Sequence, residues 1–436
     1  METTMAWDFE TDPEFQKHLD WMDEFITNEV QPLDLVLGNP YDKSDEAAID
    51  ILRPLQDQVR ERGLWACHLG PDLGGPGYGQ LKLALMNQII GRSRFAPTIF
   101  GCQAPDSGNA EILAHYGTES QKDRYLQPLL KGEISSCYSM TEPHAGADPT
   151  LFTTTATRDG DEWVLNGEKW FSSNARFASF FIVMVVTNPD VSAYEGMSMF
   201  IVPAEAPGVN IIRNTGIGAE PEGEGTHGYM HYDNVRLTDD NLLGDPGGAF
   251  AIAQVRLGGG RIHHAMRTIA QLEAAFDMMC ERALSRQTRN GTLASLGVVQ
   301  EQIADTWIEI EQFKLLVLRT AWKIDKYNDY LKVRKDISAV KVAMPKVYHD
   351  VVMRAMHLHG ALGVSNEMPF TGMLIASEVM ALADGPTEVH KSTVARQVLR
   401  EHSAVDGLWP TGHLPARRAA ARVKYAEYFE RQAAEH

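Results

Sequence analysis

The stretch YSMTEPHAGAD, residues 138–148, marks the point where the hydrophobic pattern of the chain changes. Before it, from about residue 9 to 130, apolar residues recur at helical spacing, as Leu52, Leu55 and Val59 do. After it, to about residue 244, short apolar runs such as 180–186 and 199–202 are typical of strands. The stretch itself contains proline and glycine, and its local composition alone predicts a connecting turn.

The strand region carries one strong turn signal. Residues 162–171, EWVLNGEKWF, alternate between apolar and polar positions around Asn166-Gly167. Asn-Gly favours a two-residue turn because both positions must adopt positive φ, so we predict a hairpin that turns there. A further strand is expected at 228–232. Several strands without intervening helices predict an antiparallel barrel or sandwich.

Beyond Pro246 the helical period returns. One apolar stripe extends over about eight turns and comprises Leu296, Val299, Ile303, Trp307, Ile310, Phe313, Val317 and Ile324. A stripe of this length is typical of a helical bundle or a subunit interface. We therefore predict a mainly α fold with a β domain: an N-terminal helical domain at 1–135, a central β domain at 136–245, a C-terminal helical bundle at 246–400 and an extension at 401–436.

Composition excludes some classes of function. The 40 Lys and Arg residues against 58 Asp and Glu residues give a formal net charge of −18, which argues against binding a nucleic-acid backbone. The longest apolar run, 177–186, is too short to span a bilayer. The four scattered cysteines and the acidic N-terminus predict free thiols, no metal site and no secretory signal. We expect a cytoplasmic protein without membrane insertion.

The string Thr-Glu-Pro-x-x-Gly-x-Asp within 141–148 resembles the signature of the acyl-CoA dehydrogenase family. Five more segments resemble the family in the same order: 166–173, 244–250, 286–288, 357–363 and 384–388. The resemblance covers nearly the whole chain. It implies a helical domain, a β-barrel-like domain and a four-helix bundle, with FAD between domains and across the subunit interface of a homodimer or homotetramer.

The resemblance also implies which residues contact ligands. Those expected at FAD are Tyr138, Met140, Thr141, Gly146, Ala147, Phe171, Ser172, Ser173, Arg286, Thr288, Leu296, His357, Gly360, Ala361, Pro386, Thr387 and Glu388. Those expected at the acyl-CoA are Ala147, Gly258, Arg261 and Gly385. The chain departs from the family pattern at Arg289-Asn290, which replace Phe-Gly, and at His357 and Ala361, which replace glutamine and glycine.

Asp384 is the expected catalytic base. Taken alone, an aspartate before Gly385-Pro386 is typical of a helix N-cap, but in the family this position holds the base, usually as glutamate. Some relatives place the base at the position that matches Gly260, which cannot serve here. The neighbouring His263 and His264 are interpreted as ordinary helix residues. Together, 256–264 and 384–386 resemble the subgroup of acyl-CoA dehydrogenase families ten and eleven, without their kinase-like domains.

The implied activity is FAD-dependent α,β-dehydrogenation of an acyl-CoA to the 2-enoyl-CoA, as in fatty-acid β-oxidation. Asp384 would remove the α-proton, a hydride would pass to flavin N5, and the electrons would go to an electron-transferring flavoprotein. Two alternatives stay open. One is a flavoenzyme that uses oxygen, either an acyl-CoA oxidase or a relative of nitroalkane oxidase, which also uses an aspartate base. The other is a flavin-free scaffold without catalysis.

Overall fold

The computed structural model describes residues 10–146, 148–218 and 220–434. The chain divides into two compact units, one ending at Lys391 and the other beginning at Ser392. Within the described residues, no helix combines the length and apolarity needed to cross a membrane. All four cysteines are free thiols, and three of them are buried.

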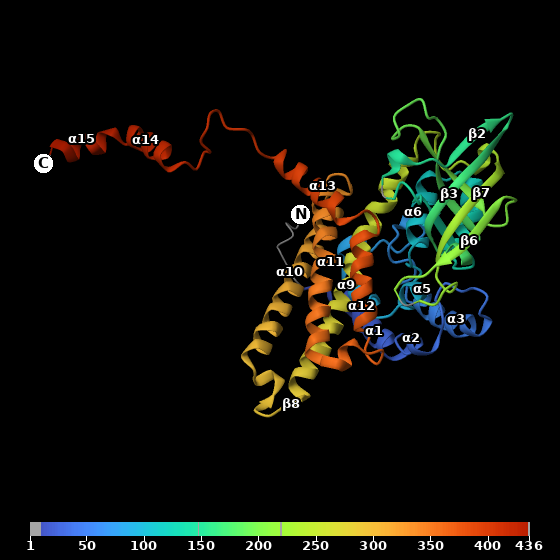
Figure 1. The fold of residues 1–436 in the computed structure, drawn as a ribbon, viewed down its shortest axis with the longest axis horizontal. Coiled ribbons are helices and arrows are strands. Elements are labelled where there is room, and N and C mark those ends of the chain that lie inside the picture. The colour runs from blue at the N-terminus through green and yellow to red at the C-terminus, as the bar shows by residue number, and fades with distance from the viewer. Residues whose placement is uncertain (1–9, 147, 219, 435–436) are drawn as a thin grey trace. The chain divides into compact units, whose positions relative to one another are not determined.

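The N-terminal part of the first unit is helical (Figure 1). α1 begins at Pro13 because the Asp12 carboxylate accepts a hydrogen bond from the Phe15 N–H and because proline suits the first helical position. In α3 the predicted face, with Leu52, Leu55 and Val59, is buried. The elements of this part are α1 (Pro13–Phe25), η1 (Ile26–Val30), α2 (Leu33–Val36), α3 (Glu46–Glu61), η2 (Pro71–Leu73), α4 (Gly79–Ile90), α5 (Ala96–Ile99), α6 (Asp106–Tyr116), α7 (Glu119–Gln121), η3 (Lys122–Leu126) and α8 (Gln127–Leu130).

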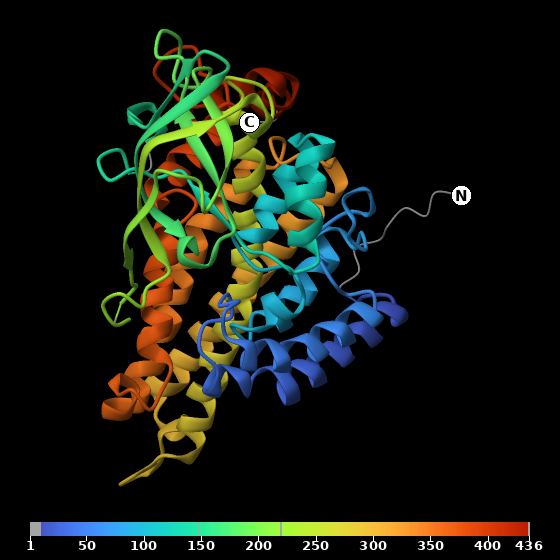
Figure 2. The ribbon, with the colours of Figure 1, turned by 90° about the vertical axis from the view of Figure 1, so that its right-hand side faces the viewer.

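The central part is one seven-stranded sheet that curls on itself (Figure 2). Its strands are β1 (Ser136–Ser139), β2 (Thr155–Asp159), β3 (Glu162–Ser173), β4 (Phe180–Val186), β5 (Met197–Pro203), β6 (Val209–Thr215) and β7 (His227–Leu237). They are ordered β1-β4-β2-β3-β7-β6, with β5 paired to β4. The fold class is confirmed, although the sheet is mixed because β1 runs parallel to β4.

The predicted hairpin at Asn166-Gly167 is wrong. β3 passes through both residues as one strand, and the chain turns instead at residues 160–161, between β2 and β3. Gly167 has φ +139°, and the pairing of β3 with β7 shifts register between Leu165 and Gly167. A Cβ at this position would lie 2.6 Å from the Cα of Thr154. The glycine therefore serves a β-bulge and a close backbone approach, which the dipeptide alone does not distinguish from a turn.

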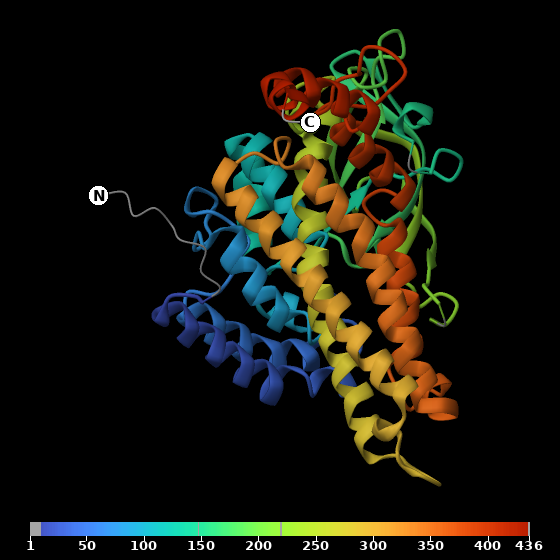
Figure 3. The ribbon, with the colours of Figure 1, turned by 90° about the vertical axis from the view of Figure 1, so that its left-hand side faces the viewer.

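Long helices follow the sheet. They are α9 (Ala249–Ser285), α10 (Gly297–Tyr327), α11 (Arg334–His359) and α12 (Phe370–Leu382), with the small hairpin β8 (Gln287–Thr288) and β9 (Gly291–Thr292) between α9 and α10. α9 packs against α10, α11 and the N-terminal α4 (Figure 3). The predicted stripe on α10 is largely buried, as at Ile310, Phe313 and Val317, but Trp307 is 54% exposed. The shorter elements are η4 (Pro149–Leu151), η5 (Ala175–Phe177), η6 (Asp239–Asn241), η7 (Leu293–Ser295) and η8 (Gly360–Val364).

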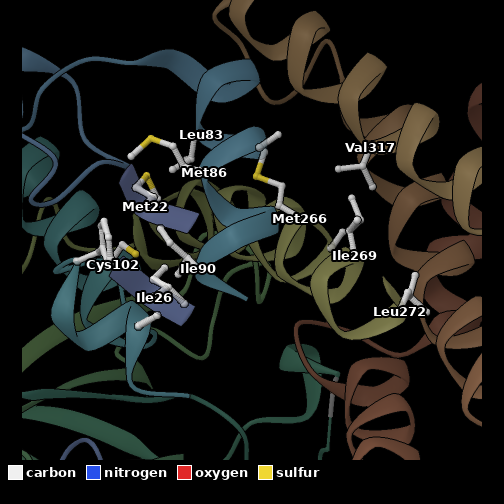
Figure 4. Packing of buried hydrophobic residues seen from close by; sticks show 14 of the residues in the cluster. Met22, Ile26, Leu83, Met86, Ile90, Cys102, Met266, Ile269, Leu272 and Val317 are labelled. Carbon is white, nitrogen blue, oxygen red and sulfur yellow. The ribbon is translucent and has the colours of Figure 1, made fainter. Parts of the chain in front are cut away.

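The main hydrophobic core joins the N-terminal helices to the bundle. Met22 and Ile26 meet Met86 and Ile90 of α4, and Met266 and Ile269 of α9 continue the cluster to Val317 of α10 (Figure 4). These side chains are fully buried. The core holds α9 against the N-terminal helices and against the rest of the bundle. The residues of α9 therefore have a defined place beside α4 and α6.

The chain continues through α13 (Thr387–Leu399) into the second unit. That unit contains α14 (Leu414–Lys424), which carries Arg417, Arg418 and Arg422, and α15 (Ala426–Ala434). Neither of these two helices contains a buried residue.

Candidate active site

Asp384 lies on the turn between α12 and α13. Its φ is +55°, and that of Gly385 is +102°. Aspartate is among the few non-glycine residues that adopt the left-handed region at modest cost. α13 begins at Thr387, so the residue directly before the helix is Pro386 and not Asp384. The aspartate therefore does not occupy the N-cap position that its local sequence suggests.

The Asp384 side chain faces a cavity and not open solvent. It is 18% exposed and lines a cavity of about 50 Å³. The other polar side chains of the lining come from the segment before α4, from α6 and from α9: His68, Ser107, Glu111, Arg256, His263, His264 and Arg267. The carboxylate thus meets a small chamber to which α9 and the segment 104–111 contribute about equally.

Three basic side chains hold the turn that carries Asp384. Arg261 Nε donates to the Asp384 carbonyl oxygen at 2.9 Å, and His390 Nε2 lies 3.2 Å from the same oxygen. Lys341 Nζ donates to the carbonyl of Met380, near the end of α12. Burial lowers the pKa of His390 to about 4 and that of Lys341 to about 8, although Asp384 opposes the shift of Lys341. These contacts fix the backbone of a residue in an uncommon conformation.

Gly260 makes room for the carboxylate. A Cβ built on Gly260 would lie 3.0 Å from Asp384 Oδ2, which is tighter than an ordinary van der Waals contact. A side chain at position 260 and the Asp384 carboxylate would thus compete for one volume. Glycine at 260 is what allows Asp384 to lie directly against α9.

Replacing Gly260 with alanine is expected to slow turnover about tenfold, because the new methyl group displaces the carboxylate by a few tenths of an ångström and catalytic geometry is sensitive to such shifts. Stopped-flow measurement of substrate-dependent flavin reduction checks this. Gly372→Ala is the matched control, since Gly372 lies on α12 with nothing within 4 Å of a built Cβ. Equal rates for the G260A variant and the wild type would show that the contact does not position Asp384.

The end of β1 connects this cavity to the sheet. Tyr138 is buried, and the Arg256 guanidinium lies 3.9 Å from its ring centroid. Arg256 also donates through Nε to Asn109 Oδ1 at 2.8 Å, which fixes the guanidinium beside the ring. Burial raises the pKa of the Tyr138 hydroxyl to about 12, with a smaller contribution from the negative charge of Asp384. Met140 and Thr141 follow two and three residues later.

Comparison with known proteins gives a consistent result. Models of the acyl-CoA dehydrogenase N-terminal, middle and C-terminal domains match residues 12–133, 137–235 and 247–399. The probable acyl-CoA dehydrogenase FadE2 of Mycobacterium tuberculosis is 41% identical over 365 residues, which are 83% of this chain and 88% of that protein. The chain belongs to the acyl-CoA dehydrogenase family. It is accordingly placed in the acyl-CoA dehydrogenase class of enzymes, whose cofactor is FAD.

Two further relatives refine the comparison. Acyl-CoA dehydrogenase family member 11 of Gallus gallus is 41% identical over 358 residues, 81% of this chain but 46% of that protein. The chain therefore spans about half the length of that relative. The structure of a putative acyl-CoA dehydrogenase from Mycobacterium abscessus has a TM-score of 0.83 at 37% identity and covers 91% of this chain and 100% of that one. The resemblance to the subgroup with family member 11 is confirmed.

The residues expected at the flavin ring lie where β1 and β3 end. Phe171 has φ +51° and is 44% exposed, and its ring centroid lies 5.0 Å from that of Trp170. The backbone N–H of Trp170 donates to the Thr141 carbonyl at 2.7 Å, which holds the two segments together. A Cβ built on Gly146 would meet nothing within 4 Å. Ala147 lies outside the described residues.

The two serines of this segment differ. The Ser172 hydroxyl is buried inside the sheet domain, 2.8 Å from the Ser139 hydroxyl, so only its backbone remains for a ligand. The Ser173 hydroxyl lies 2.9 Å from His227 Nδ1 and is less buried. Of the two hydroxyls, that of Ser173 is thus the more accessible.

A second group of expected FAD residues lies at the far end of the bundle, near β8 (Figure 1). Arg286 is exposed where α9 ends, and His357, Gly360 and Ala361 are exposed where α11 ends. Arg282 bonds the carbonyl of His359, which joins the two helix ends. Thr288, whose hydroxyl donates to the Gly291 carbonyl, and the half-buried Leu296 belong to the same region. Arg261 and Ser285 are roughly 36 Å apart along α9, so this group cannot share one small site with Asp384 of the same chain.

The remaining expected residues surround the Asp384 turn. Pro386 directly precedes α13, and Thr387 is the first residue of that helix, with its hydroxyl donating to the Ala381 carbonyl. Glu388 is exposed. Gly258 faces Tyr330, whose ring would lie 3.2 Å from a built Cβ. Of the expected substrate residues, the structure therefore brings Arg261 and Gly385 directly to Asp384.

The described residues fit a flavin. The indole Nε1 of Trp170 is buried without a hydrogen-bond partner among them, beside the exposed ring of Phe171. At the far end of the bundle, Arg282 Nε is likewise buried without a described partner. The indole N–H of Trp170 and the aromatic rings beside it suit the flavin ring of FAD. The arginines at the far end of the bundle suit its pyrophosphate. Trp170, Phe171 and Ser173 would hold the ring portion, where FAD supplies the hydride acceptor.

The sequence interpretation missed several polar residues of the cavity, among them His264 and Glu111. His264 Nε2 lies 3.8 Å from Asp384 Oδ2, so His264 is more than an ordinary helix residue; its position one turn after Gly260 was the available signal. Glu111 of α6 is a second carboxyl group in the lining. Burial raises the pKa of Glu111 to about 7, against the attraction of Arg256. Nothing in the local sequence of α6 indicated it.

Glu142, a residue of the string at 141–148, has a structural role. Its carboxylate accepts hydrogen bonds from the backbone N–H groups of Thr153 and Thr154 and from Lys169 Nζ at 2.8 Å. Lys169 is completely buried and also donates to the Met140 carbonyl. Burial raises the pKa of Glu142, but Lys169 and these hydrogen bonds outweigh it and hold the pKa below its usual value. The ion pair fixes the loop after β1 against β3, the same two segments that meet at Trp170.

Proposed function

We propose that this protein oxidises the α,β-bond of an acyl-CoA thioester to the 2-enoyl-CoA, with Asp384 as the base. The observation that carries the proposal is the carboxylate of Asp384, which faces a cavity bounded by α9 while its backbone is held by Arg261 and His390. A base must be fixed within reach of the proton that it removes. Among the carboxylates of the described residues, Asp384 combines that fixation with the position at which the family carries its base.

The residues of the chain would act as follows. Asp384 accepts the proton from the substrate Cα onto a carboxylate oxygen, and its backbone N–H polarises the thioester carbonyl as an oxyanion-hole donor. FAD, which Trp170, Phe171 and Ser173 would hold, would supply the acceptor for the hydride that leaves Cβ. Arg261 keeps the turn in place during the transfer by its bond to the Asp384 carbonyl. The cavity of about 50 Å³ is too small for a whole acyl-CoA, so the CoA portion remains outside it.

We propose an electron-transferring flavoprotein as the acceptor of the electrons. The test is anaerobic mixing of the holoenzyme with a panel of acyl-CoA thioesters, followed by oxygen or by an electron-transferring flavoprotein. We expect bleaching of the flavin by at least one thioester, slow return of colour with oxygen and fast return with the flavoprotein. Fast return with oxygen indicates an oxidase. Bleaching by a nitroalkane and by none of the thioesters indicates a nitroalkane oxidase and overturns the proposal.

The distance along α9 supports a site shared between two subunits. Because Arg286 and His357 lie far from Asp384 of the same chain, their flavin contacts would be made to the FAD of a neighbouring subunit in a homodimer or homotetramer.

Arg286→Ala is therefore expected to lower the FAD content of the purified oligomer severalfold, since it removes a charge-assisted contact to the pyrophosphate. The flavin-to-protein ratio measures this by absorbance. Arg289→Ala is a control for the loss of an exposed arginine in the same hairpin. An R286A oligomer with full flavin content would contradict the shared site.

A further inference from the structure

His264 lies where it can control the orientation of the Asp384 carboxylate. Asp384 Oδ2 is 3.0 Å from the position that a Cβ on Gly260 would take and 3.8 Å from His264 Nε2. Residues 260 and 264 lie one turn apart on the same face of α9. The helix therefore presents a recess at Gly260 and an imidazole at its edge, and the carboxylate lies in the recess with one oxygen toward the ring.

We propose that His264 is a positioning residue for the base: an N–H at its Nε2 holds the Asp384 carboxylate in its orientation toward the cavity. This proposal rests on the function proposed above. Arg261 and His390 bind the backbone carbonyl of Asp384, which fixes the turn without a bond to the carboxylate. His264 is the α9 side chain whose ring nitrogen faces the carboxylate itself.

The distance of 3.8 Å is longer than a hydrogen bond, so the interaction in this structure is electrostatic. Catalytic hydrogen bonds are often long before substrate binds and shorten in the complex. Burial lowers the pKa of His264, and Asp384 opposes that shift, so the ring is largely neutral at pH 7. A neutral imidazole with hydrogen on Nε2 still directs a positive dipole at the carboxylate.

Other groups also act on this pair. The charged and titratable side chains that face Asp384 or His264, or line the same cavity, come from five elements and the segment before α4: Glu111 of α6, Tyr138 of β1, Arg256, Arg261, His263 and Arg267 of α9, Lys341 of α11, His390 of α13, and His68. Arg256 and Arg267 have their Nε groups bound to Asn109 and Asn87. His263 lies beside Gln80, with its Nε2 3.1 Å from Oε1. The Nε groups of Arg256 and Arg267 and the Nε2 of His263 thus have partners other than Asp384.

The test compares His264→Ala with His264→Gln in the FAD-loaded oligomer. Glutamine can place an amide N–H where Nε2 lies, whereas alanine cannot. We expect the H264A variant to reduce its flavin about tenfold or more slowly, and the acid limb of the pH profile of kcat/KM to move to higher pH by about half to one unit. The H264Q variant should keep the acid limb near that of the wild type. His115→Gln, an exposed histidine of α6, is the control for loss of an imidazole.

The outcomes separate the two proposals. If the wild type reduces its flavin with acyl-CoA and the H264A variant has an unchanged acid limb, the positioning role is overturned and the proposed function stands. If both variants lose rate equally without a shift of the profile, His264 is only structural. A wild type whose flavin no acyl-CoA reduces overturns both. Flavin content and circular dichroism of each variant establish that it has folded.

Discussion

Asp384→Asn is expected to retain FAD and to lose reduction of the flavin by acyl-CoA, with the rate falling by roughly 10² to 10⁴-fold, the range that general-base catalysis contributes. Asparagine keeps the size and the backbone conformation of aspartate, since both residues tolerate positive φ. The bonds from Arg261 and His390 to the carbonyl at 384 do not depend on the side chain. Stopped-flow absorbance of the flavin under anaerobic conditions measures the rate.

Two further substitutions, measured beside Asp384→Asn, show whether the loss of rate is specific to Asp384. Asp190→Asn removes an exposed carboxylate far from α9 in the sequence and should leave the rate unchanged. Glu111→Gln removes the other carboxyl group of the cavity. Glu111 and Asp384 approach α9 at successive residues, Gly259 and Gly260, which point in different directions on a helix. A normal rate for the D384N variant together with loss of activity in the E111Q variant would transfer the role of base to Glu111.

Lys169→Met is expected to destabilise the fold by about 3–5 kcal/mol, because it leaves the Glu142 carboxylate buried without its counter-ion. Lys169 is 0% exposed and Glu142 is 4% exposed at the side chain. Methionine fills a similar volume, so the effect reports the lost charge and hydrogen bonds and not a cavity. Urea unfolding followed by circular dichroism measures the shift, and the flavin content should fall because the loop after β1 is released.

The control for this variant is another ion pair in the same sheet domain. Arg158 and Asp239 are 44% and 60% exposed at the side chain, and exposed pairs contribute less than about 1 kcal/mol. Arg158→Met should therefore leave the unfolding midpoint nearly unchanged. A K169M variant as stable as the R158M variant would show that the buried pair does not hold the two segments together.

The sequence was most informative where a pattern repeats. The stripe of α10 and the run of β4 follow from hydrophobic period alone, since each turn or residue pair adds the same signal. The Asn166-Gly167 dipeptide misled because a glycine in a bulge and a glycine in a turn have the same local sequence. What separates them is the contact with Thr154, twelve or more residues away, which no local pattern contains.

The site was predictable only in part. Asp384 was indicated by its place in a family pattern, whereas its own sequence context favoured a helix cap. Glu111 and His68 come to the cavity from separate segments through the packing of the N-terminal helices on α9. This proximity depends on the core around Met86 and Met266, and the spacing of residues along the sequence does not indicate it. His264 is an intermediate case: its separation of four residues from Gly260 is visible in the sequence, but its proximity to Asp384 is not.

The central claim is that Asp384 takes the α-proton of an acyl-CoA held against the flavin. The most direct measurement is the rate of anaerobic flavin bleaching by an acyl-CoA deuterated at Cα, compared with the unlabelled thioester, in the wild type and in the D384N variant. We predict that deuterium slows bleaching in the wild type severalfold and that the variant bleaches with neither thioester on the same timescale. Equal bleaching rates for the labelled and unlabelled thioesters in the wild type, together with normal bleaching in the variant, would contradict the account.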